Sequence, residues 1–148
     1  MAALSWPKPE PGLVIRYSYL WQSEADAGLE EGDKKRPCAI ILVVLSKGEM
    51  PFVRVLPVTH SRPHDPESAI EIPLQTKKRL GLDEEQSWII LDEANDFTWP
   101  GPDLRPMVNG KPETVAYGYL PPGLMKALGE KLARRQKKLL ANIVQRTE

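Results

Sequence analysis

The spacing of apolar residues predicts short strands along most of the chain and a helix near its end. The longest apolar run, residues 38–45, is nearly continuous and is bounded by Pro37 and by the turn-forming residues 46–48, which is typical of a central strand. The other runs are short and rich in β-branched and aromatic residues, as strands commonly are. Together these runs predict five strands, at residues 13–21, 38–45, 52–58, 69–73 and 87–92.

Polar segments connect the predicted strands. Pro57 interrupts the strand at 52–58, so we expect the end of that strand to lie at a sheet edge or a bulge. No long helical pattern separates the strands, which favours a small β-barrel over strand-helix-strand units. The predicted connections are a mobile acidic loop at 22–35, loops at 61–67 and 94–101, and a short helix or turn at 75–81.

After Pro121 the apolar residues recur at helical spacing, while lysines and arginines occupy the other faces. Pro122 suits the first turn of a helix. We therefore expect an amphipathic helix that packs its apolar stripe on the barrel or on a second subunit. The stripe comprises Leu124, Met125, Leu128, Leu132, Leu139, Leu140, Ile143 and Val144.

The length of 148 residues and the hydrophobic content of 41% suit one buried core with a C-terminal appendage. The fold class expected is mainly β with a C-terminal helix. Along the chain this gives an irregular N-terminal segment at 1–11, a barrel domain at 12–120 and a basic amphipathic helix at 121–148.

Charge is unevenly distributed along a chain whose formal net charge is zero. From Lys126 to the C-terminus seven basic residues face two acidic ones, a local net charge of +5 that leaves −5 for the rest. Such a segment either forms a basic face for an anionic partner or is a solvated helix surface, and the sequence leaves both interpretations open.

Cellular location and cofactors follow from what the sequence lacks. The longest apolar run is too short to cross a bilayer and the N-terminus lacks a signal-peptide pattern, so we expect a cytoplasmic protein without a membrane partner. Cys38 is the single cysteine and lies in a predicted strand, where it is expected to be a core residue. With two histidines and one cysteine, no metal-ligand spacing is recognisable, and we predict no metal and no cofactor.

Two segments concentrate groups that suit a phosphodiester. In residues 32–37, Arg36 and the following proline lead directly into the central strand. In residues 53–61, Thr59, His60 and Ser61 follow a second strand. A guanidinium beside hydroxyl and imidazole groups matches the charge and geometry of a phosphate. The two segments resemble the core signatures of the PemK/MazF toxin family, small endoribonucleases of bacterial toxin-antitoxin systems.

The resemblance implies an SH3-like β-barrel and metal-independent cleavage of single-stranded RNA, in which a 2′-hydroxyl attacks and a cyclic phosphate and a free 5′-hydroxyl remain. It also implies a homodimer and a cognate antitoxin that covers the RNA groove. Carried over to this sequence, the family's catalytic arginine and threonine are Arg36 and Thr59. The family usually has serine directly after that threonine, whereas here His60 intervenes before Ser61.

Each of these residues also has a plainer interpretation. Arg36 suits charge stabilisation, but it could instead brace a strand by pairing with Asp33 or Asp92. Thr59 could simply bond the backbone of the turn that follows it. Histidine changes its protonation near neutral pH and suits proton transfer, but strand alternation points His60 away from the face of Thr59.

Further candidates come from the resemblance and from charge. Glu24 and Asp92 correspond to acidic positions of the family, although Ile90 replaces an arginine often found near the second. Glu24 is a candidate for orienting Arg36 or is a solvated loop carboxylate. Trp99 could stack on RNA bases or pack against Phe97. The candidates for RNA contact are Lys77, Lys78, Arg79, Trp99 and Arg105.

Two other functions fit the same sequence. One is a non-catalytic module on the same barrel that binds nucleic acid or protein, since a fold alone does not decide activity. The other is a regulator that binds nucleic acid through the basic helix without cutting it.

Overall fold

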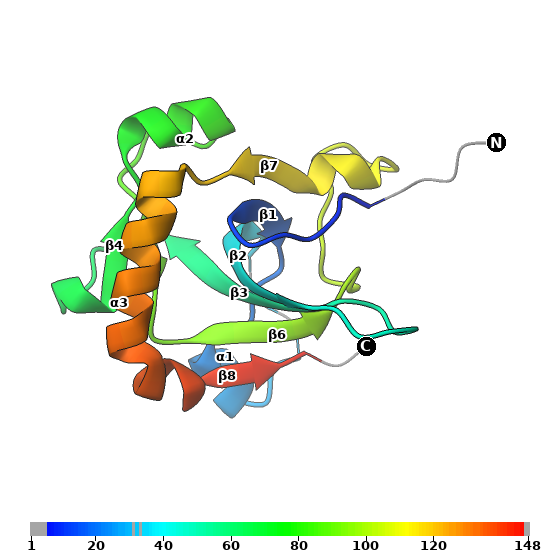
Figure 1. The fold of residues 1–148 in the computed structure, drawn as a ribbon, viewed down its shortest axis with the longest axis horizontal. Helices are drawn as coiled ribbons and strands as arrows, with labels where there is room; N and C mark the ends of the chain where they lie inside the picture. Colours follow the sequence, from blue (N-terminus) through cyan, green and yellow to red (C-terminus); the bar gives the residue numbers. More distant parts are fainter. Residues whose placement is uncertain (1–5, 31, 33, 147–148) are drawn as a thin grey trace.

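The structure is a computed structural model that describes residues 6–30, 32 and 34–146. Within these residues the fold is mixed α/β, with a mainly antiparallel eight-stranded sheet and a C-terminal helix (Figure 1). The strands are β1 (Leu13–Tyr17), β2 (Arg36–Val44), β3 (Phe52–Thr59), β4 (Ala69–Glu71), β5 (Trp88–Ile90), β6 (Ala94–Thr98), β7 (Ala116–Tyr119) and β8 (Ile143–Gln145). The helices are α1 (Gln22–Asp26), α2 (Leu74–Leu80) and α3 (Pro122–Leu140), with 3-10 turns at Pro66–Ser68 and Pro112–Val115.

The strands lie in the order β4-β5-β3-β2-β1-β7, and β6 joins both β3 and β8. Only the β6–β8 pair is parallel. The ladders between the described strands do not close into a ring. The described part of the chain therefore shows a branched antiparallel sheet.

Strand β3 changes partner along its length. Its first half pairs with β6 up to Val55, whereas Val58 and Thr59 pair with β5. Pro57 lies between these two ladders and opposite Cys38 of β2. The proline therefore marks the point at which β3 changes partner.

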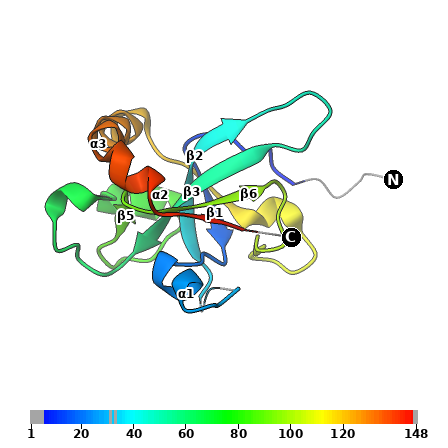
Figure 2. The ribbon, with the colours of Figure 1, turned by 90° about the horizontal axis from the view of Figure 1, so that it is seen from below.

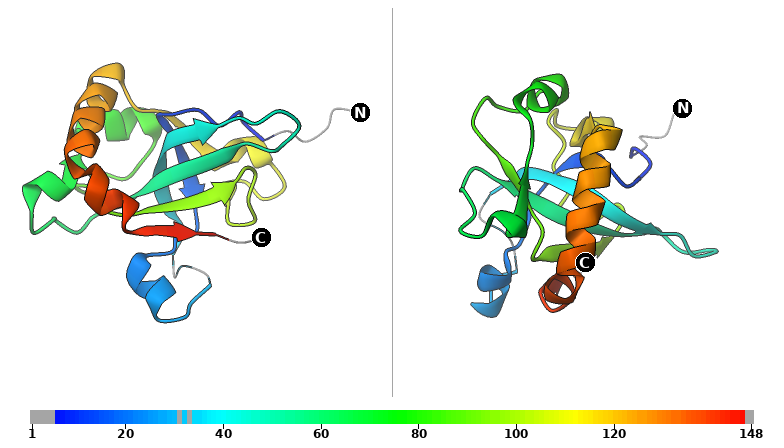
Figure 3. Two further views of the ribbon diagram at one scale, coloured as in Figure 1. Left: turned by 60° about the horizontal axis from the view of Figure 1, so that its bottom comes forward. Right: turned by 60° about the vertical axis from the view of Figure 1, so that its left-hand side comes forward.

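The first half of β2 is buried on both faces, which explains the apolar residues 38–40, whereas Leu42, Val44 and Leu45 further along the hairpin are exposed. Cys38 and Ile40 of β2 belong to one core cluster, while Ala39 belongs to a second. Leu128 and Leu139 of α3 pack into the second cluster. Two views show α3 lying along one side of the sheet (Figure 3). A strand covered on both faces shows no alternation of apolar and polar residues.

The β2–β3 hairpin extends beyond the rest of the sheet, with Leu45 and Met50 exposed near its tip (Figure 2). The opposite end of these two strands is where Arg36 begins β2 and Thr59 ends β3. The hairpin connection thus lies at the other end of both strands from Arg36 and Thr59.

Two predicted loops contain secondary structure. The segment 22–35 begins with α1, and the side chain of Glu24 accepts a hydrogen bond from the backbone of Trp21 at the helix start (3.0 Å). The segment 94–101 contains β6, in which Asn95 and Asp96 are buried. Strand β1 is shorter than predicted and ends at Tyr17, and β7 was not predicted.

The polar residues of β6 explain why the pattern predicted a loop there. Asn95 exchanges two hydrogen bonds with the backbone of Leu20 (2.8 and 2.9 Å). Asp96 accepts two from Arg54 (2.8 and 3.0 Å). Buried polar groups are tolerated when they are paired in this way, so a core strand can look polar in sequence.

The C-terminal helix is shorter than its apolar stripe suggested. It ends at Leu140, where the side chain of Asn142 donates to the carbonyl of Lys138 (3.0 Å). Ile143 and Val144, predicted as helical, instead form β8 beside β6. None of the described helices has both the length and the apolar character that a membrane span requires. Within its described part, residues 6–11, the N-terminal segment has no helix or strand, as predicted.

Arg146 ties the C-terminal strand to the rest of the fold. Its side chain is only 4% exposed and pairs with Asp103 (2.9 Å). It also donates to the carbonyl of Ser18 (2.8 Å) and to the side chain of Asn95 (3.0 Å). Arg146 thus anchors the segment after β8 to Ser18 and Asp103 and to Asn95 of β6.

Candidate functional site

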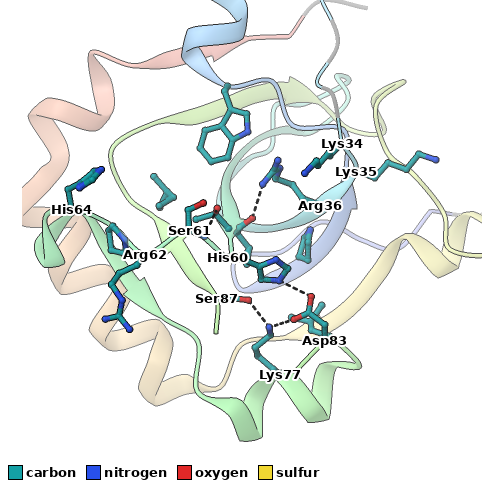
Figure 4. A pocket seen from close by; sticks show the side chains of 17 residues that line it. Lys34, Lys35, Arg36, His60, Ser61, Arg62, His64, Lys77, Asp83 and Ser87 are labelled. Atoms are coloured by element: carbon teal, nitrogen blue, oxygen red, sulfur yellow. Dashed lines mark hydrogen bonds and ion pairs between the residues drawn. The ribbon is translucent and has the colours of Figure 1, made fainter. Parts of the chain in front are cut away.

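A pocket of about 740 Å³ opens where β2 begins and β3 ends (Figure 4). Its volume lies in the range of about 300–1,000 Å³ that is usual for ligand sites. The lining residues come from the start of α1, from β2 and the segment before it, from the end of β3 and the turn after it, from α2 and from β5 with the connection between them. They are Trp21, Lys34, Lys35, Arg36, Pro37, Val58, Thr59, His60, Ser61, Arg62, Pro63, His64, Lys77, Leu82, Asp83, Ser87 and Ile90.

The register of β2 and β3 brings the two predicted catalytic residues together. Cys38 lies opposite Pro57 in this antiparallel pair. That pair ends the ladder, and Arg36 lies two residues before Cys38 while Thr59 lies two residues after Pro57, so both lie at the same end of the strand pair. The guanidinium of Arg36 donates to the carbonyl of Val58 (3.3 Å). Both predicted catalytic residues therefore line one pocket.

The guanidinium of Arg36 is held from two sides. It lies 4.9 Å from the centre of the Trp21 ring, a cation–π arrangement, and it is bonded to Val58. Its Nε is buried and has no hydrogen-bond partner among the described residues. Asp92, one of the two partners considered for it, instead pairs with Arg135, and the other, Asp33, lies outside the described residues.

Gly32 allows the chain to approach the core just before the basic segment. A Cβ at this position would lie 1.9 Å from the carbonyl oxygen of Tyr19, so no other residue fits without a shift of the backbone. This close approach helps to fix where the chain turns toward Lys34, Lys35 and Arg36.

Thr59 bonds the turn that follows it, as the plainer interpretation predicted. Its hydroxyl oxygen accepts a hydrogen bond from the backbone N–H of Ser61 (3.1 Å). A threonine hydroxyl has one donor and two acceptor positions, so the proton of Thr59 is still available for another acceptor in the pocket. Ser61 is exposed beside it and lines the same pocket.

Positive charge dominates the pocket, although the protein as a whole is neutral. Lys34 and Lys35 are exposed at its rim, and Arg36 and Arg62 also line it. Among the lining residues Asp83 is the one carboxylate, and it pairs with the ammonium of Lys77. The remaining cations make the pocket attractive to an anion.

His60 lies in the same pocket as Thr59, against the expectation from strand alternation. The strand ends at Thr59, so the alternation does not extend to the next residue. His60 Nε2 lies 2.8 Å from Asp83 Oδ2, and its Nδ1 lies 3.4 Å from Glu85 Oε2. Partial burial disfavours the ionised form of Asp83, but the hydrogen bond and charge of Lys77, with His60, hold the pKa of that carboxyl below its usual value.

Lys77 is an internal residue and not the surface RNA contact that we predicted. It is 2% exposed and donates to Asp83 Oδ1, to the carbonyl of Glu85 and to Ser87 Oγ (2.6 Å for the last). Its two neighbours on α2, Lys78 and Arg79, are exposed, and Arg79 donates to the carbonyl of Tyr119 (2.7 Å).

His60, Asp83 and Glu85 also form a group with the donor types of a metal site. Each offers one ligand atom, and these atoms lie within 4.8 Å of one another. The sequence did not reveal the group because His60 lies 23 residues before Asp83 along the chain. Asp83 is already bonded to the cationic Lys77, which competes with a metal ion at that carboxylate. The absence of a metal stays a prediction.

Several other candidates lie away from the pocket. Glu24 is engaged at the start of α1, and Asp92 accepts two hydrogen bonds from Arg135 (2.7 and 2.9 Å). Trp99 is 3% exposed and stacks on Phe97, so the prediction of a surface stacking platform is wrong and its alternative is right. Arg105 borders a second, smaller pocket and donates to the carbonyl of Pro102.

Three of the six basic residues of α3, Arg134, Arg135 and Lys138, pair with carboxylates of the protein itself. Arg135 binds Asp92 and Asp65, and Arg134 lies 3.7 Å from Glu67. Lys138 lies 3.5 Å from Asp92, and Lys131 donates to the carbonyls of Pro66 and Ala69. These contacts favour a paired and solvated helix face over a nucleic-acid surface.

Cys38 is fully buried, and burial raises the pKa of its thiol. A thiol of this kind is a core group without nucleophilic character.

The sequence left several pocket residues without a role. Lys34 and Lys35 were visible as a charge run beside Arg36, a pattern that can indicate an anion site. Asp83 and Arg62 carried no local pattern that would assign them to this pocket.

One carboxyl near the pocket predicts a pH dependence of stability. Glu93 accepts hydrogen bonds from the Tyr19 hydroxyl and the Gln22 backbone, both at 3.0 Å, and so helps to anchor the start of α1 next to Trp21. Burial raises the pKa of Glu93. Because the raised pKa belongs to the folded state, the contribution of Glu93 is present below the ordinary carboxyl pKa and is lost as the pH rises through the raised value.

We therefore expect wild type to lose stability relative to Glu93→Gln as the pH rises above the ordinary carboxyl pKa of about 4, because the amide oxygen can accept the same bonds without a charge. Urea unfolding at several pH values measures this difference. If wild type instead gained stability relative to Glu93→Gln as the pH rises, the raised pKa of Glu93 would be contradicted.

No protein-family model matches this chain, and no curated protein matches it. The resemblance to the PemK/MazF toxins therefore depends on the two short motifs and on the pocket in which they meet.

Proposed function

We propose that the chain is a metal-independent endoribonuclease of the PemK/MazF type that cleaves single-stranded RNA as the toxin of a toxin-antitoxin pair. The observation that carries the proposal is the meeting of Arg36 and Thr59, one from each motif, in a positively charged pocket. The proposal includes the finer fold assignment, an SH3-like barrel built on the observed sheet, and the homodimer and antitoxin that the resemblance implies.

The two side chains offer what phosphoryl chemistry requires. A guanidinium can donate two parallel hydrogen bonds to phosphate oxygens and stabilise the charge that develops on them. The hydroxyl of Thr59 can donate a further bond, since its own acceptor contact is to the Ser61 backbone. In the proposed reaction the 2′-oxygen attacks phosphorus and the bond to the 5′-oxygen breaks, which leaves a 2′,3′-cyclic phosphate and a 5′-hydroxyl.

The surroundings of Arg36 suit an unpaired strand. Lys34 and Lys35 provide two exposed cations beside the guanidinium for neighbouring phosphates. Trp21 lines the same pocket and is partly exposed. Proteins commonly recognise single strands by combining cations along the backbone with aromatic rings next to the bases.

The test is to incubate the purified protein with mixed-sequence single-stranded RNA in excess chelator and to identify the ends of the products. We expect fragments with a 2′,3′-cyclic phosphate and a 5′-hydroxyl, and no cleavage of DNA of the same sequences. Salt-sensitive binding without cleavage would support the non-catalytic module instead. Cleavage that requires an added divalent ion, or neither binding nor cleavage, would overturn the proposal.

The two rim lysines predict a change in the salt dependence of RNA binding. Each phosphate contact to a single strand contributes about 0.7 to the slope of log affinity against log salt. Replacing Lys34 and Lys35 by glutamine is expected to lower that slope by about 1.4 if both contact phosphates. The matched control replaces Lys126 and Lys137, two exposed lysines of α3, and is expected to leave the slope unchanged. A lower slope for the α3 variant, with an unchanged slope for the Lys34 and Lys35 variant, would support a regulator that binds through α3.

A further inference from the structure

The proposed reaction needs a group that accepts the proton of the 2′-hydroxyl, and neither the guanidinium of Arg36 nor the hydroxyl of Thr59 suits that role. His60 lies in the same pocket, with carboxylates beside both ring nitrogens. We propose that His60 is the general base of the cleavage reaction and that Asp83, anchored by the buried Lys77, positions it. This inference rests on the proposed function and adds a residue and a role to it.

The hydrogen-bond geometry assigns the two ring nitrogens. The pKa of Asp83 is lowered, so its carboxyl is ionised near neutral pH and can only accept hydrogen bonds. In neutral His60 the proton must therefore be on Nε2, which lies 2.8 Å from Asp83 Oδ2. Nδ1 then carries the lone pair, and the carboxylate of Glu85, 3.4 Å away, has no proton to donate to it. Nδ1 is thus the nitrogen able to accept a proton from a bound ribose.

Lys77 explains why Asp83 stays in place. Its ammonium is almost completely buried and bonds Asp83, Ser87 and the backbone of Glu85. Asp83 also accepts a hydrogen bond from the Glu85 backbone (3.1 Å). A buried ammonium is tolerated only when it is paired and hydrogen-bonded, so the connection between α2 and β5 is built around this lysine. Lys77 and Asp83 are therefore positioning residues, and His60 alone is assigned to the chemistry.

The charges around His60 come from several elements. Asp83 and Glu85 come from the α2–β5 connection, Lys77 from α2 and Arg36 from β2. In the close view the imidazole lies between Arg36 and Asp83 (Figure 4). The remaining cations of the pocket are Lys34, Lys35 and Arg62. The two carboxylates stabilise the imidazolium that forms when the base takes up a proton, whereas the cations oppose it.

The step balances without a metal or an oxidant. His60 Nδ1 takes the proton of the 2′-hydroxyl, and the oxygen electron pair forms a bond to phosphorus while the bond from phosphorus to the 5′-oxygen breaks. The departing 5′-oxygen takes a proton from water, and the resulting hydroxide takes the proton from the imidazolium. The products are the cyclic phosphate and the 5′-hydroxyl, with His60 neutral again.

The experiment compares His60→Ala with His64→Ala, a matched change of the other histidine that lines the pocket. General acid–base catalysis contributes about 100- to 10,000-fold, so His60→Ala is expected to lose activity in that range, whereas His64→Ala is expected to lose much less. Added imidazole should restore part of the activity of His60→Ala. The wild-type rate should rise with pH, because only an unprotonated imidazole can act as the base, and the variant should lack that rise. Asp83→Asn should shift this rise along the pH axis and should lower the rate less than His60→Ala does.

The outcomes separate this inference from the proposed function. If wild type does not cleave RNA in chelator, the proposed function fails. If wild type cleaves and depends on Arg36, but His60→Ala is as active as His64→Ala, the assignment of the base is wrong and the proposed function stands. A loss of activity in His60→Ala with an unchanged pH profile and no rescue by imidazole would show a structural role, which also overturns the inference.

Discussion

Arg36→Ala is expected to lower the rate of RNA cleavage by about 100- to 1,000-fold, the usual loss when one donor to the developing charge is removed. The guanidinium makes one hydrogen bond within the described residues, to the carbonyl of Val58, and it stacks on Trp21. Its removal therefore costs the pocket its central cation and little of the fold. Initial rates in chelator measure the effect, and thermal unfolding checks that the variant is folded.

Two further variants sharpen this prediction. Arg36→Lys keeps the charge but loses the planar fork, so it should recover only a small part of the rate. Arg62→Ala removes another cation of the same pocket, one that lies over the Trp88 ring, and should weaken RNA binding with a much smaller effect on the rate. Equal rates for wild type and Arg36→Ala would contradict the catalytic assignment.

Arg146→Ala is expected to lower the free energy of unfolding by about 3–5 kcal/mol, because breaking a buried ion pair leaves an uncompensated charge. The partner left behind is Asp103, itself only 10% exposed. Ser18 and Asn95 lose a hydrogen bond in the same variant. Urea unfolding measures the loss.

The matched control is Arg134→Ala, since Arg134 forms an exposed ion pair with Glu67 on the surface of α3. An exposed pair contributes about 0–1 kcal/mol, so this control should unfold close to wild type. Equal stability of Arg146→Ala and wild type would show that the buried contacts of Arg146 do not stabilise the fold.

The sequence predicted the parts of the fold that have a simple local pattern. The apolar run at 38–45 and the following strand correspond to β2 and β3, because both are short apolar segments bounded by turn residues. Arg36 and Thr59 were predictable as neighbours of a site because each lies at a strand end marked by its own motif. Antiparallel pairing of two consecutive strands then places those ends together.

The features that were not predicted depend on partners far away in sequence. Strand β6 looked like a loop because Asn95 and Asp96 are polar, and their partners Leu20 and Arg54 are more than 40 residues away. The apolar stripe of α3 continued into β8 because spacing alone does not show where a helix stops. The link from His60 to Asp83 spans 23 residues, so no local pattern announced it.

The central claim is that the pocket around Arg36 holds a phosphodiester of single-stranded RNA. The most direct measurement is an NMR titration of the labelled protein with 2′-O-methyl RNA of mixed sequence, in which the attacking oxygen is blocked. We predict shifts of the Arg36 side-chain and Trp21 indole signals, with the buried Trp99 indole unchanged. Shifts confined to α3, or no shifts at RNA concentrations that saturate cleavage, would contradict the claim.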